Sequence, residues 1–145
     1  MEILTVKIQG QGYLLNGTMS VPAADGNREH ELIKQWLAEG NEPEAEFSAE
    51  ELESQRLAEL KRAKMDALTK IVVEVDGKAF DGNETARLNM ISAIQASELL
   101  GVNDNAWKLA DNTVATVTVD ELKQTLALAI QEVGRIVMVE SIEEL

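Results

Sequence analysis

Cysteine is absent from the 145-residue sequence. Its absence excludes disulfide bonds, thiolate nucleophiles and metal sites that use cysteine ligands. Aromatic residues are also scarce, at 3% of the chain, although hydrophobic residues as a whole reach 45%. This aliphatic composition is typical of helices packed on a small sheet, and it disfavours an aromatic-rich β-sandwich.

Basic residues are few in comparison with acidic ones. The chain has 13 Lys and Arg against 26 Asp and Glu, a formal net charge of -13. A surface of this sign repels phosphate backbones, so we expect no nucleic-acid partner, whereas a basic protein partner would suit it. No apolar stretch reaches the roughly 18 residues of a membrane-spanning helix. The first residues also lack the order of a secretory signal, so we expect no membrane partner.

Catalytic signatures are missing as well. The single histidine, His30, lies among charged residues at the start of a helical stretch, so we expect a solvated side chain rather than a general base. No serine lies in a G-x-S-x-G elbow, and Gly10 and Gly12 lack the third glycine of a phosphate loop. The acidic loop around Asp76 and Asp81 does not follow calcium-loop spacing. We therefore expect no enzymatic activity, no cofactor and no metal site.

The N-terminal residues carry the pattern of a hairpin followed by a helix. Alternating apolar residues over 3–9 predict a half-buried strand, and Asn16–Gly17 between two apolar runs predicts a hairpin turn. Asn27 is the expected N-cap of a helix over 28–39, and an acidic linker follows. The alternation consists of Leu4, Val6 and Ile8, and the helical stripe of Leu32, Ile33, Trp36 and Leu37. We expect a hairpin-helix module over residues 1–46.

A long helix is predicted from the Ser48-x-x-Glu51 capping box to about Thr69. Its apolar side, which is the candidate interaction surface, consists of Leu57, Leu60, Met65 and Leu68. A heptad frame through Leu57, Leu60, Lys64, Ala67 and Ile71 is too short to indicate a coiled coil. Two interpretations stay open: packing within its own domain, which we favour, or a bundle with symmetry-related copies.

The remaining sequence predicts a hairpin, a helix, a short strand and a second long helix. Asp76–Gly77 is the expected hairpin turn, Asn83 the N-cap of a helix that Gly101 ends, and Thr118 and Glu121 the capping box of the last helix. The expected buried face of the first of these helices consists of Leu88, Ile91, Ala93, Ile94 and Leu99. That of the second consists of Leu122, Leu126, Ala129, Ile130, Val133 and Val137.

Trp107 admits two interpretations. In the first, Trp107 stacks on a ligand beside Asp111 and Asn112. In the second, it closes one end of a core, before a turn and a short strand over 113–117. We favour the structural interpretation, because every neighbouring residue then has a local task.

The order of elements shows no βαβ alternation, so we expect an α+β fold. It would comprise the N-terminal module over 1–46 and a C-terminal α+β domain over 47–145, with a long helix, a hairpin, a helix, a strand and a helix. The sheet of that domain is expected to be small and antiparallel.

Two segments resemble parts of bacteriophage tail proteins. Val21–Glu46 is similar to an N-terminal segment of many such proteins, with the pattern V-P, an acidic turn, N-R, an aromatic, and W-x-A-x-G-N-x-P. The matching residues are Val21, Pro22, Asn27, Arg28, Trp36, Ala38, Gly40, Asn41 and Pro43. His30 stands where tyrosine is usual, and Ala45 where a second proline is common. Residues from about Arg56 to Ile136 are similar to a domain of unknown function at the ends of tail-fibre and tail-associated proteins, through "VDGKAFDGNETARLNMISAIQA" and "WKLADNTVATVTVDEL".

This resemblance implies a virion protein and no catalytic residues. The expected function is a structural one: a tail, baseplate or tail-fibre component that works by protein–protein assembly. Its partners would be other tail, baseplate or fibre proteins, with a homo-oligomer as one form. It would be located in the virion tail, and in the host cytoplasm during assembly. The alternative is a tail-fibre assembly chaperone that leaves before the virion matures, and a third class is an enzyme acting on host surface sugars.

Overall fold

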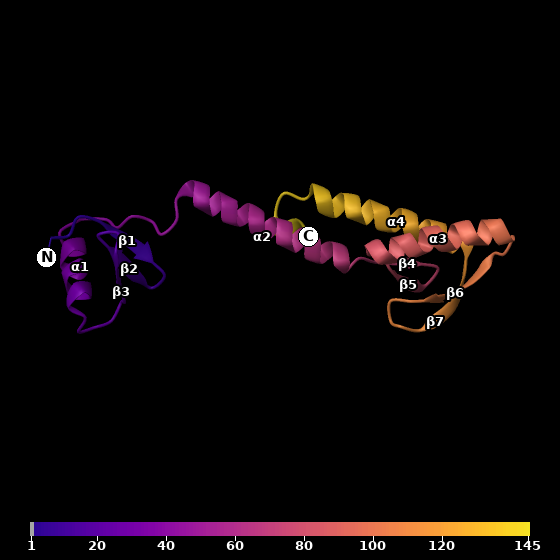
Figure 1. Cartoon of the computed structure of the whole chain (residues 1–145), viewed down its shortest axis with the longest axis horizontal. Coiled ribbons are helices and arrows are strands. Elements are labelled where there is room, and N and C mark those ends of the chain that lie inside the picture. Colours follow the sequence, from indigo (N-terminus) through magenta and orange to yellow (C-terminus); the bar gives the residue numbers. More distant parts are fainter. Residues whose placement is uncertain (1) are drawn as a thin grey trace. The chain divides into compact units, whose positions relative to one another are not determined.

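The computed structural model describes residues 2–145, which form two compact units divided between Gln55 and Arg56 (Figure 1). Over the described residues, helices combine with small antiparallel sheets, so the predicted α+β class is confirmed. The division between the units falls inside helix α2 (Ala49–Thr69), after the acidic linker in which the sequence indicated a boundary.

The first unit is a three-stranded antiparallel sheet packed on one helix. Its strands are β1 (Val6–Gln9), β2 (Gly12–Leu15) and β3 (Met19–Val21), which pair in chain order, and its helix is α1 (Arg28–Ala38). The core consists of Val6, Leu15, Val21 and Ile33, flanked by Ile3, Tyr13, Trp36 and Leu37. Trp36 thus contributes to the core of this unit, as expected from its helical stripe.

Two tight turns create this sheet. Asn16 and Gly17 adopt φ angles of 52° and 75°, which the turns of short hairpins require, so the predicted turn is confirmed. Gly10, at a φ of 57°, lies in a second turn that joins β1 to β2. The strand expected over 3–9 and the hairpin expected at Asn16–Gly17 thus join in one three-stranded sheet.

Strand β1 lies at one edge of the sheet and is only partly buried. Val6 is buried, but Leu4 and Ile8 are exposed, so the predicted alternation is wrong outside Val6. Leu4 precedes the strand, and Ile8 is the next-to-last residue of the strand, opposite Tyr13. The N–H of Glu44 donates to the Val6 carbonyl at 2.8 Å, and the Glu44 carbonyl accepts from the Ile8 N–H at 2.9 Å. Part of the expected linker therefore covers the sheet edge of the first unit.

The second unit contains two β-hairpins, two further helices and most of α2. Its elements after α2 are β4 (Val72–Val75), β5 (Lys78–Asp81), α3 (Glu84–Leu100), β6 (Asp104–Lys108), β7 (Val114–Thr118), α4 (Val119–Met138) and the 3-10 helix η1 (Ile142–Glu144). The main core consists of Val75, Phe80, Met90, Ile94, Val117, Val119 and Leu122. A second cluster, Ile71, Ala129 and Ile136, joins the end of α2 to α4.

Strand β6 is an element that the sequence did not indicate. Asp104–Lys108 pairs with β7, with Trp107 opposite Ala115. Asp and Asn have low β-propensity, so this strand carries little local signal and forms because β7 offers it a partner. The turn predicted at Asn112 is confirmed by its φ of 67°.

The buried face of α3 differs from the prediction. Ile94 is buried and Ala93 half-buried, as expected, but Leu88, Ile91 and Leu99 are exposed. The face that meets the core consists of Ala86, Met90, Ala93, Ile94 and Ser97. Small side chains on this face allow close packing, and a pattern that weights only large apolar residues overlooks them.

Helix α4 departs from the prediction in the same way. The inward-facing residues include Leu122, Leu126, Ala129 and Val133 as expected, joined by Thr125 and Ile136. Ile130 and Val137, however, are 55% and 52% exposed, so the expectation that they are buried is wrong. The apolar residues of α4 extend beyond the side that packs, and spacing alone does not identify that side.

The caps predicted at Asn27, Asn83, Gly101 and Thr118 are confirmed, and Ser48 Oγ accepts the Glu51 N–H at 3.1 Å. Asn27 and Asn83 each accept a backbone N–H at 2.9 Å with the side-chain oxygen, and Gly101 ends α3 at a φ of 67°. Thr118 and Glu121 form the complete reciprocal capping box. Among residues 2–145, the helices are too short or too polar to cross a membrane.

Glu121 also connects α4 to the first hairpin of its unit. Its Oε2 accepts a hydrogen bond from Lys78 Nζ at 2.6 Å, and its side chain is only 10% exposed. The hydrogen bond from Lys78, supported by the backbone N–H of Thr118, holds the pKa of Glu121 below its ordinary value of 4.5. This carboxylate therefore serves two neighbours, and both contacts favour its ionised form.

Stability of the second unit is expected to fall in acid through this group. Because the folded pKa of Glu121 is lowered, its contribution is present above the unfolded pKa and is lost as the pH falls through the folded one. Glu121→Gln should therefore lower the free energy of unfolding at about pH 6 and flatten its decline towards about pH 3. Urea unfolding followed by Trp107 fluorescence measures both. Glu74→Gln, at an exposed position on β4, is the matched control, and an equal slope in both variants would contradict the assignment.

Candidate functional site

The four candidate interaction residues of α2 do not share one environment. Leu57 and Met65 are 51% and 60% exposed, whereas Leu60 is buried and Leu68 packs against the cluster that joins α2 to α4. Lys64 Nζ donates to the Val137 carbonyl at 2.8 Å on the same side of α2. This side of the helix thus packs within its own unit, which leaves Leu57 and Met65 accessible.

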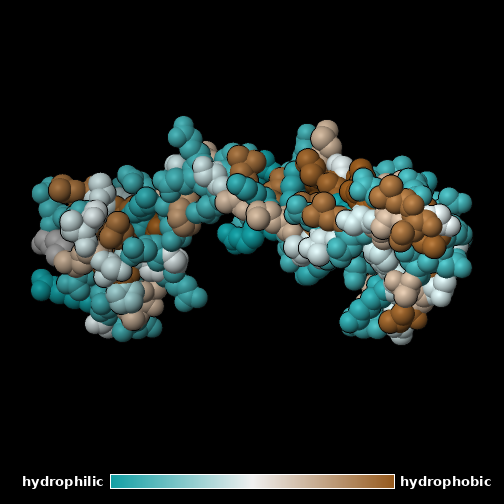
Figure 2. Space-filling model, turned by 45° about the vertical axis from the view of Figure 1, so that its right-hand side comes forward, coloured by the Kyte–Doolittle hydropathy of each residue, from teal (hydrophilic) through white to brown (hydrophobic). Residues whose placement is uncertain are grey.

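The largest set of exposed apolar side chains in the second unit lies on α3 and α4. We call it the outer helical face, and it consists of Leu88, Ile91 and Leu99 of α3 with Ile130, Val137 and Met138 of α4. Figure 2 shows hydrophobic residues gathered over these helices on the right of the view. Leu99, near the end of α3, is 88% exposed.

The two helices run antiparallel, so the residues of this face are spread along the length of the pair (Figure 1). Lys123 Nζ, near the start of α4, lies 3.0 Å from Glu98 Oε1 near the end of α3. Leu88 and Ile91, in the first half of α3, therefore lie towards the middle of α4, where Ile130 is located. The segment from Gln124 to Gln131 contains no charged residue, although charged residues make up 27% of the chain. The face is thus locally apolar on a strongly acidic chain.

Sequence reasoning assigned most of these residues to the buried sides of their helices. The signal that would have separated the two sides is the second, small-residue stripe of α3 at Ala86, Ala93 and Ser97. A helix with apolar residues on two opposite sides has more hydrophobic surface than one core needs.

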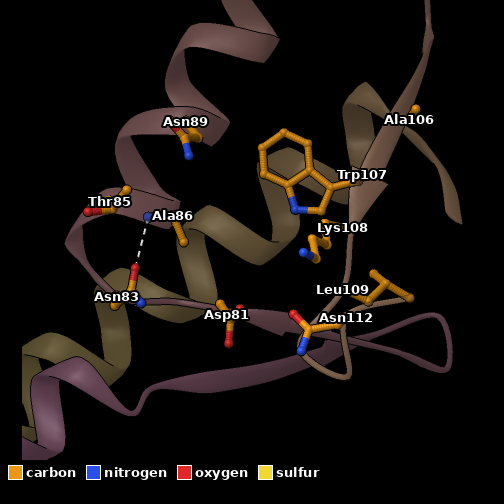
Figure 3. Close-up of a pocket in the computed structure, with 10 residues that line it drawn as sticks. All are labelled: Asp81, Asn83, Thr85, Ala86, Asn89, Ala106, Trp107, Lys108, Leu109 and Asn112. Atoms are coloured by element: carbon orange, nitrogen blue, oxygen red, sulfur yellow. Dashed lines mark hydrogen bonds between the residues drawn. The ribbon is translucent and has the colours of Figure 1, made fainter. Parts of the chain in front are cut away.

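A cleft lies between the start of α3 and the β6–β7 hairpin (Figure 3). It has a volume of about 440 Å³, and its lining residues are Asp81, Asn83, Thr85, Ala86, Asn89, Ala106, Trp107, Lys108, Leu109 and Asn112. In Figure 3 the Trp107 ring lies on the opposite side of the cleft from Asn89. Trp107 is half-buried and packs against the main core, so it both contributes to the core and borders the cleft.

Several polar side chains of this cleft already have structural partners or tasks. Asn83 Oδ1 caps α3, and Asn112 adopts the positive φ of the turn. The remaining side chains offer an indole face beside amides, the Asp81 carboxylate, the Thr85 hydroxyl and the Lys108 ammonium. That combination could take a small polar ligand with one apolar face, but the site contains no arrangement of nucleophile and base.

A group of potential ligand atoms occurs in the first unit around His30. Asp25, His30 and Glu31 bring their polar atoms together, but Lys34 Nζ lies 3.0 Å from Asp25 Oδ1 and 3.2 Å from Glu31 Oε1. The hydrogen bond from Lys34 also lowers the pKa of Asp25. The cation that these carboxylates face is therefore the lysine ammonium.

His30 itself is not the solvated side chain that the sequence indicated. It is 8% exposed, its ring is stacked on Tyr13 at a centroid distance of 6.3 Å, and Nδ1 lies 3.1 Å from the Ala24 carbonyl. The prediction was wrong because the charged neighbours in the sequence point away from the sheet, whereas position 30 faces it. These contacts give His30 a structural role.

Comparison with protein families identifies the second unit. Residues 51–139 match the model of a domain of unknown function, DUF4376. The match covers more than half of the chain and includes α3 and α4 with the outer helical face. No curated protein and no solved structure matches the chain significantly.

Proposed function

We propose that this chain, which belongs to the DUF4376 family, is a structural component of a bacteriophage tail that acts by assembly with other tail proteins and not by catalysis. The observation that carries the proposal is the outer helical face, which lies within the family domain. The similarity of Val21–Glu46 and of residues from Arg56 to Ile136 to phage tail proteins supports the choice of particle.

The physical argument for assembly is the cost of exposed apolar surface. Burying such surface is favourable by about 25 cal/mol per Å², and soluble monomers rarely expose a large contiguous apolar patch. Binding of a protein that covers Leu88, Ile91 and Leu99 would therefore be favoured by the burial of these side chains. The net charge of -13 keeps the unassembled chain soluble until that contact forms.

Mass spectrometry of purified particles tests the proposal. The particles are those of the phage or prophage that encodes the chain, separated from free protein by density-gradient centrifugation. The chain should co-purify with tails in a fixed ratio to the other tail proteins. Its absence from particles, together with a complex with a fibre protein in the lysate, would contradict the structural role and establish the chaperone alternative. Glycan cleavage by the pure protein would contradict both.

A substitution in the outer helical face tests whether this face takes part in assembly. Leu99→Lys should reduce incorporation into particles by roughly tenfold or more, because a buried leucine contact is worth about 1.5–3 kcal/mol. The side chain is 88% exposed, so the fold should tolerate the change. Ala58→Lys, at an exposed position of α2, is the matched control and should be incorporated normally. Equal incorporation of the two variants would exclude the α3 part of the face from assembly.

A further inference from the structure

An exposed stripe runs along α4, formed by Ala127, Ile130, Gly134 and Val137. The spacing of three, four and three residues is that of the a and d positions of a heptad, so the four residues lie on one side of the helix. Ile130 and Val137 are about half exposed. If a Cβ were added at Gly134, no atom of the described residues would lie within 4 Å of it, apart from its chain neighbours and the backbone of its own helix. The stripe is therefore open to a partner along its length.

The order of large and small residues in the stripe is self-complementary in one orientation. If two copies of α4 pair antiparallel about a two-fold axis level with Glu132, Ile130 of each copy comes opposite Gly134 of the other. Val137 then comes opposite Ala127. Both contacts pair a large side chain with a small one, whereas a parallel pairing would place Ile130 against Ile130 and leave a gap at Gly134. An interface of this kind uses the same patch on both subunits.

Charges near the stripe favour the same arrangement. Glu132 and Arg135, the ionised residues between Lys123 and the end of α4, pair with each other at 2.6 Å. The contact region is therefore close to neutral although the chain carries a net charge of -13, so it does not select a strongly basic partner. In the antiparallel pairing, Lys123 of one copy comes level with the acidic segment after α4 of the other, which contains Glu140 and Glu143.

We propose that the partner on this stripe is a second copy of this chain, bound antiparallel through α4. The inference rests on the proposed function, because it names one of the contacts by which the chain assembles. It is nevertheless tested on the isolated full-length protein, so its failure would not affect the presence of the chain in particles. Conversely, a chain that is absent from particles could still form this dimer.

Sedimentation equilibrium of the full chain over a range of concentrations measures the association. The expected species is a monomer–dimer equilibrium. Gly134→Ile and Ile130→Ala should each weaken dimerisation by roughly tenfold or more, since one fills the space for the large residue and the other removes that residue. The double variant Ile130→Ala with Gly134→Ile restores a large residue opposite a small one and should recover most of the affinity. Gln124→Ala, at an exposed position outside the stripe, is the matched control.

The orientation is testable because the chain contains no cysteine. A mixture of Ala127→Cys and Val137→Cys chains should form a disulfide-linked dimer on oxidation, whereas neither variant alone should do so efficiently. Efficient self-linking of Ala127→Cys would indicate parallel helices and overturn the proposal. A monomer at all concentrations, or a trimer, would overturn it as well. Gly134 substitution should leave the monomer fold intact, because a residue with a side chain is favoured over glycine within a helix.

Discussion

Phe80→Ala is expected to lower the free energy of unfolding of the second unit by about 3–5 kcal/mol. Phe80 is fully buried at the centre of the main core, where β5 meets α3, β7 and α4. Removal of its ring leaves a cavity among the residues of β4, β5, α3, β7 and α4 that form this core, and a close-packed interior relaxes only partly to fill such a cavity. Phe80 is the largest fully buried side chain of this unit.

Two tryptophans make this measurement specific, because each reports on one unit. Trp36 packs against the core of the first unit and Trp107 against that of the second. In a Trp36→Phe background, urea unfolding followed by Trp107 fluorescence should show that Phe80→Ala lowers the free energy of unfolding of the second unit. In a Trp107→Phe background, the Trp36 signal should show little change. Val72→Ala, at an exposed position on β4, should cost well under 1 kcal/mol, and an equal loss in that control would contradict the placement of the core.

Gly12→Ala is expected to destabilise the first unit by about 3 kcal/mol, the upper end of the usual range for overpacking. A Cβ at Gly12 would lie 2.3 Å from the Val21 carbonyl oxygen and 3.2 Å from Pro22 Cα. The obstructing atoms belong to the backbone of the neighbouring segment, so no side-chain rotation relieves the clash. β3 must shift away from β2, and the contact of Val21 with the core weakens.

The control for this prediction is Gln11→Ala, which changes the adjacent exposed residue of the same turn. It should leave the unfolding transition of the first unit almost unchanged when Trp36 fluorescence is followed. If Gly12→Ala matched Gln11→Ala, the close approach of β2 and β3 would be refuted. The second unit, read through Trp107, should respond to neither variant.

These core variants also separate folding from assembly. A loss of particle incorporation in Phe80→Ala would follow from an unstable domain, because assembly by the outer helical face requires α3 and α4 to be folded. A loss in Leu99→Lys with normal urea unfolding would instead locate the effect at the contact surface. The combination therefore distinguishes a residue that supports the face from one that belongs to it.

Turns and helix ends were predictable from short stretches of sequence. Asn16–Gly17, Asp76–Gly77 and the caps at Asn83 and Gly101 all occur where the sequence indicated them. Each of these signals depends on residues within a few positions of one another, through a positive φ or a side chain that accepts a nearby N–H. Such signals need no knowledge of the rest of the fold. The mixed α+β class followed from the order of elements that they delimit.

The assignment of buried and exposed sides was less accurate. Leu88 and Leu99 were expected in the core and are exposed, whereas His30 was expected at the surface and is buried. Both errors concern residues whose environment is set by chain segments distant in sequence. His30 is enclosed by Tyr13 of β2, and the inner side of α3 is defined by the strands and the helix that meet Met90.

The candidate interaction surface shows the same difference between what local sequence predicts and what residues distant in sequence determine. The sequence pointed to α2, and of its four candidates Leu57 and Met65 are the exposed ones, since Leu60 and Leu68 pack within the unit. The outer helical face was present in the sequence only as surplus hydrophobic residues on two helices. Its character as a surface became evident once the small residues of α3 were seen against the core.

The sequence by itself determined where the turns and caps lie, the α+β class, the acidic charge and the absence of cysteine chemistry. The tertiary structure decided that β6 is a strand, that Glu44 of the linker pairs with the edge strand β1, and which side of each long helix remains exposed. The physical reason is the distance along the chain over which each interaction acts. Hydrogen bonds at caps and turns act within a few residues, whereas burial is a competition among all apolar surfaces for a limited core, and only the folded chain settles that competition.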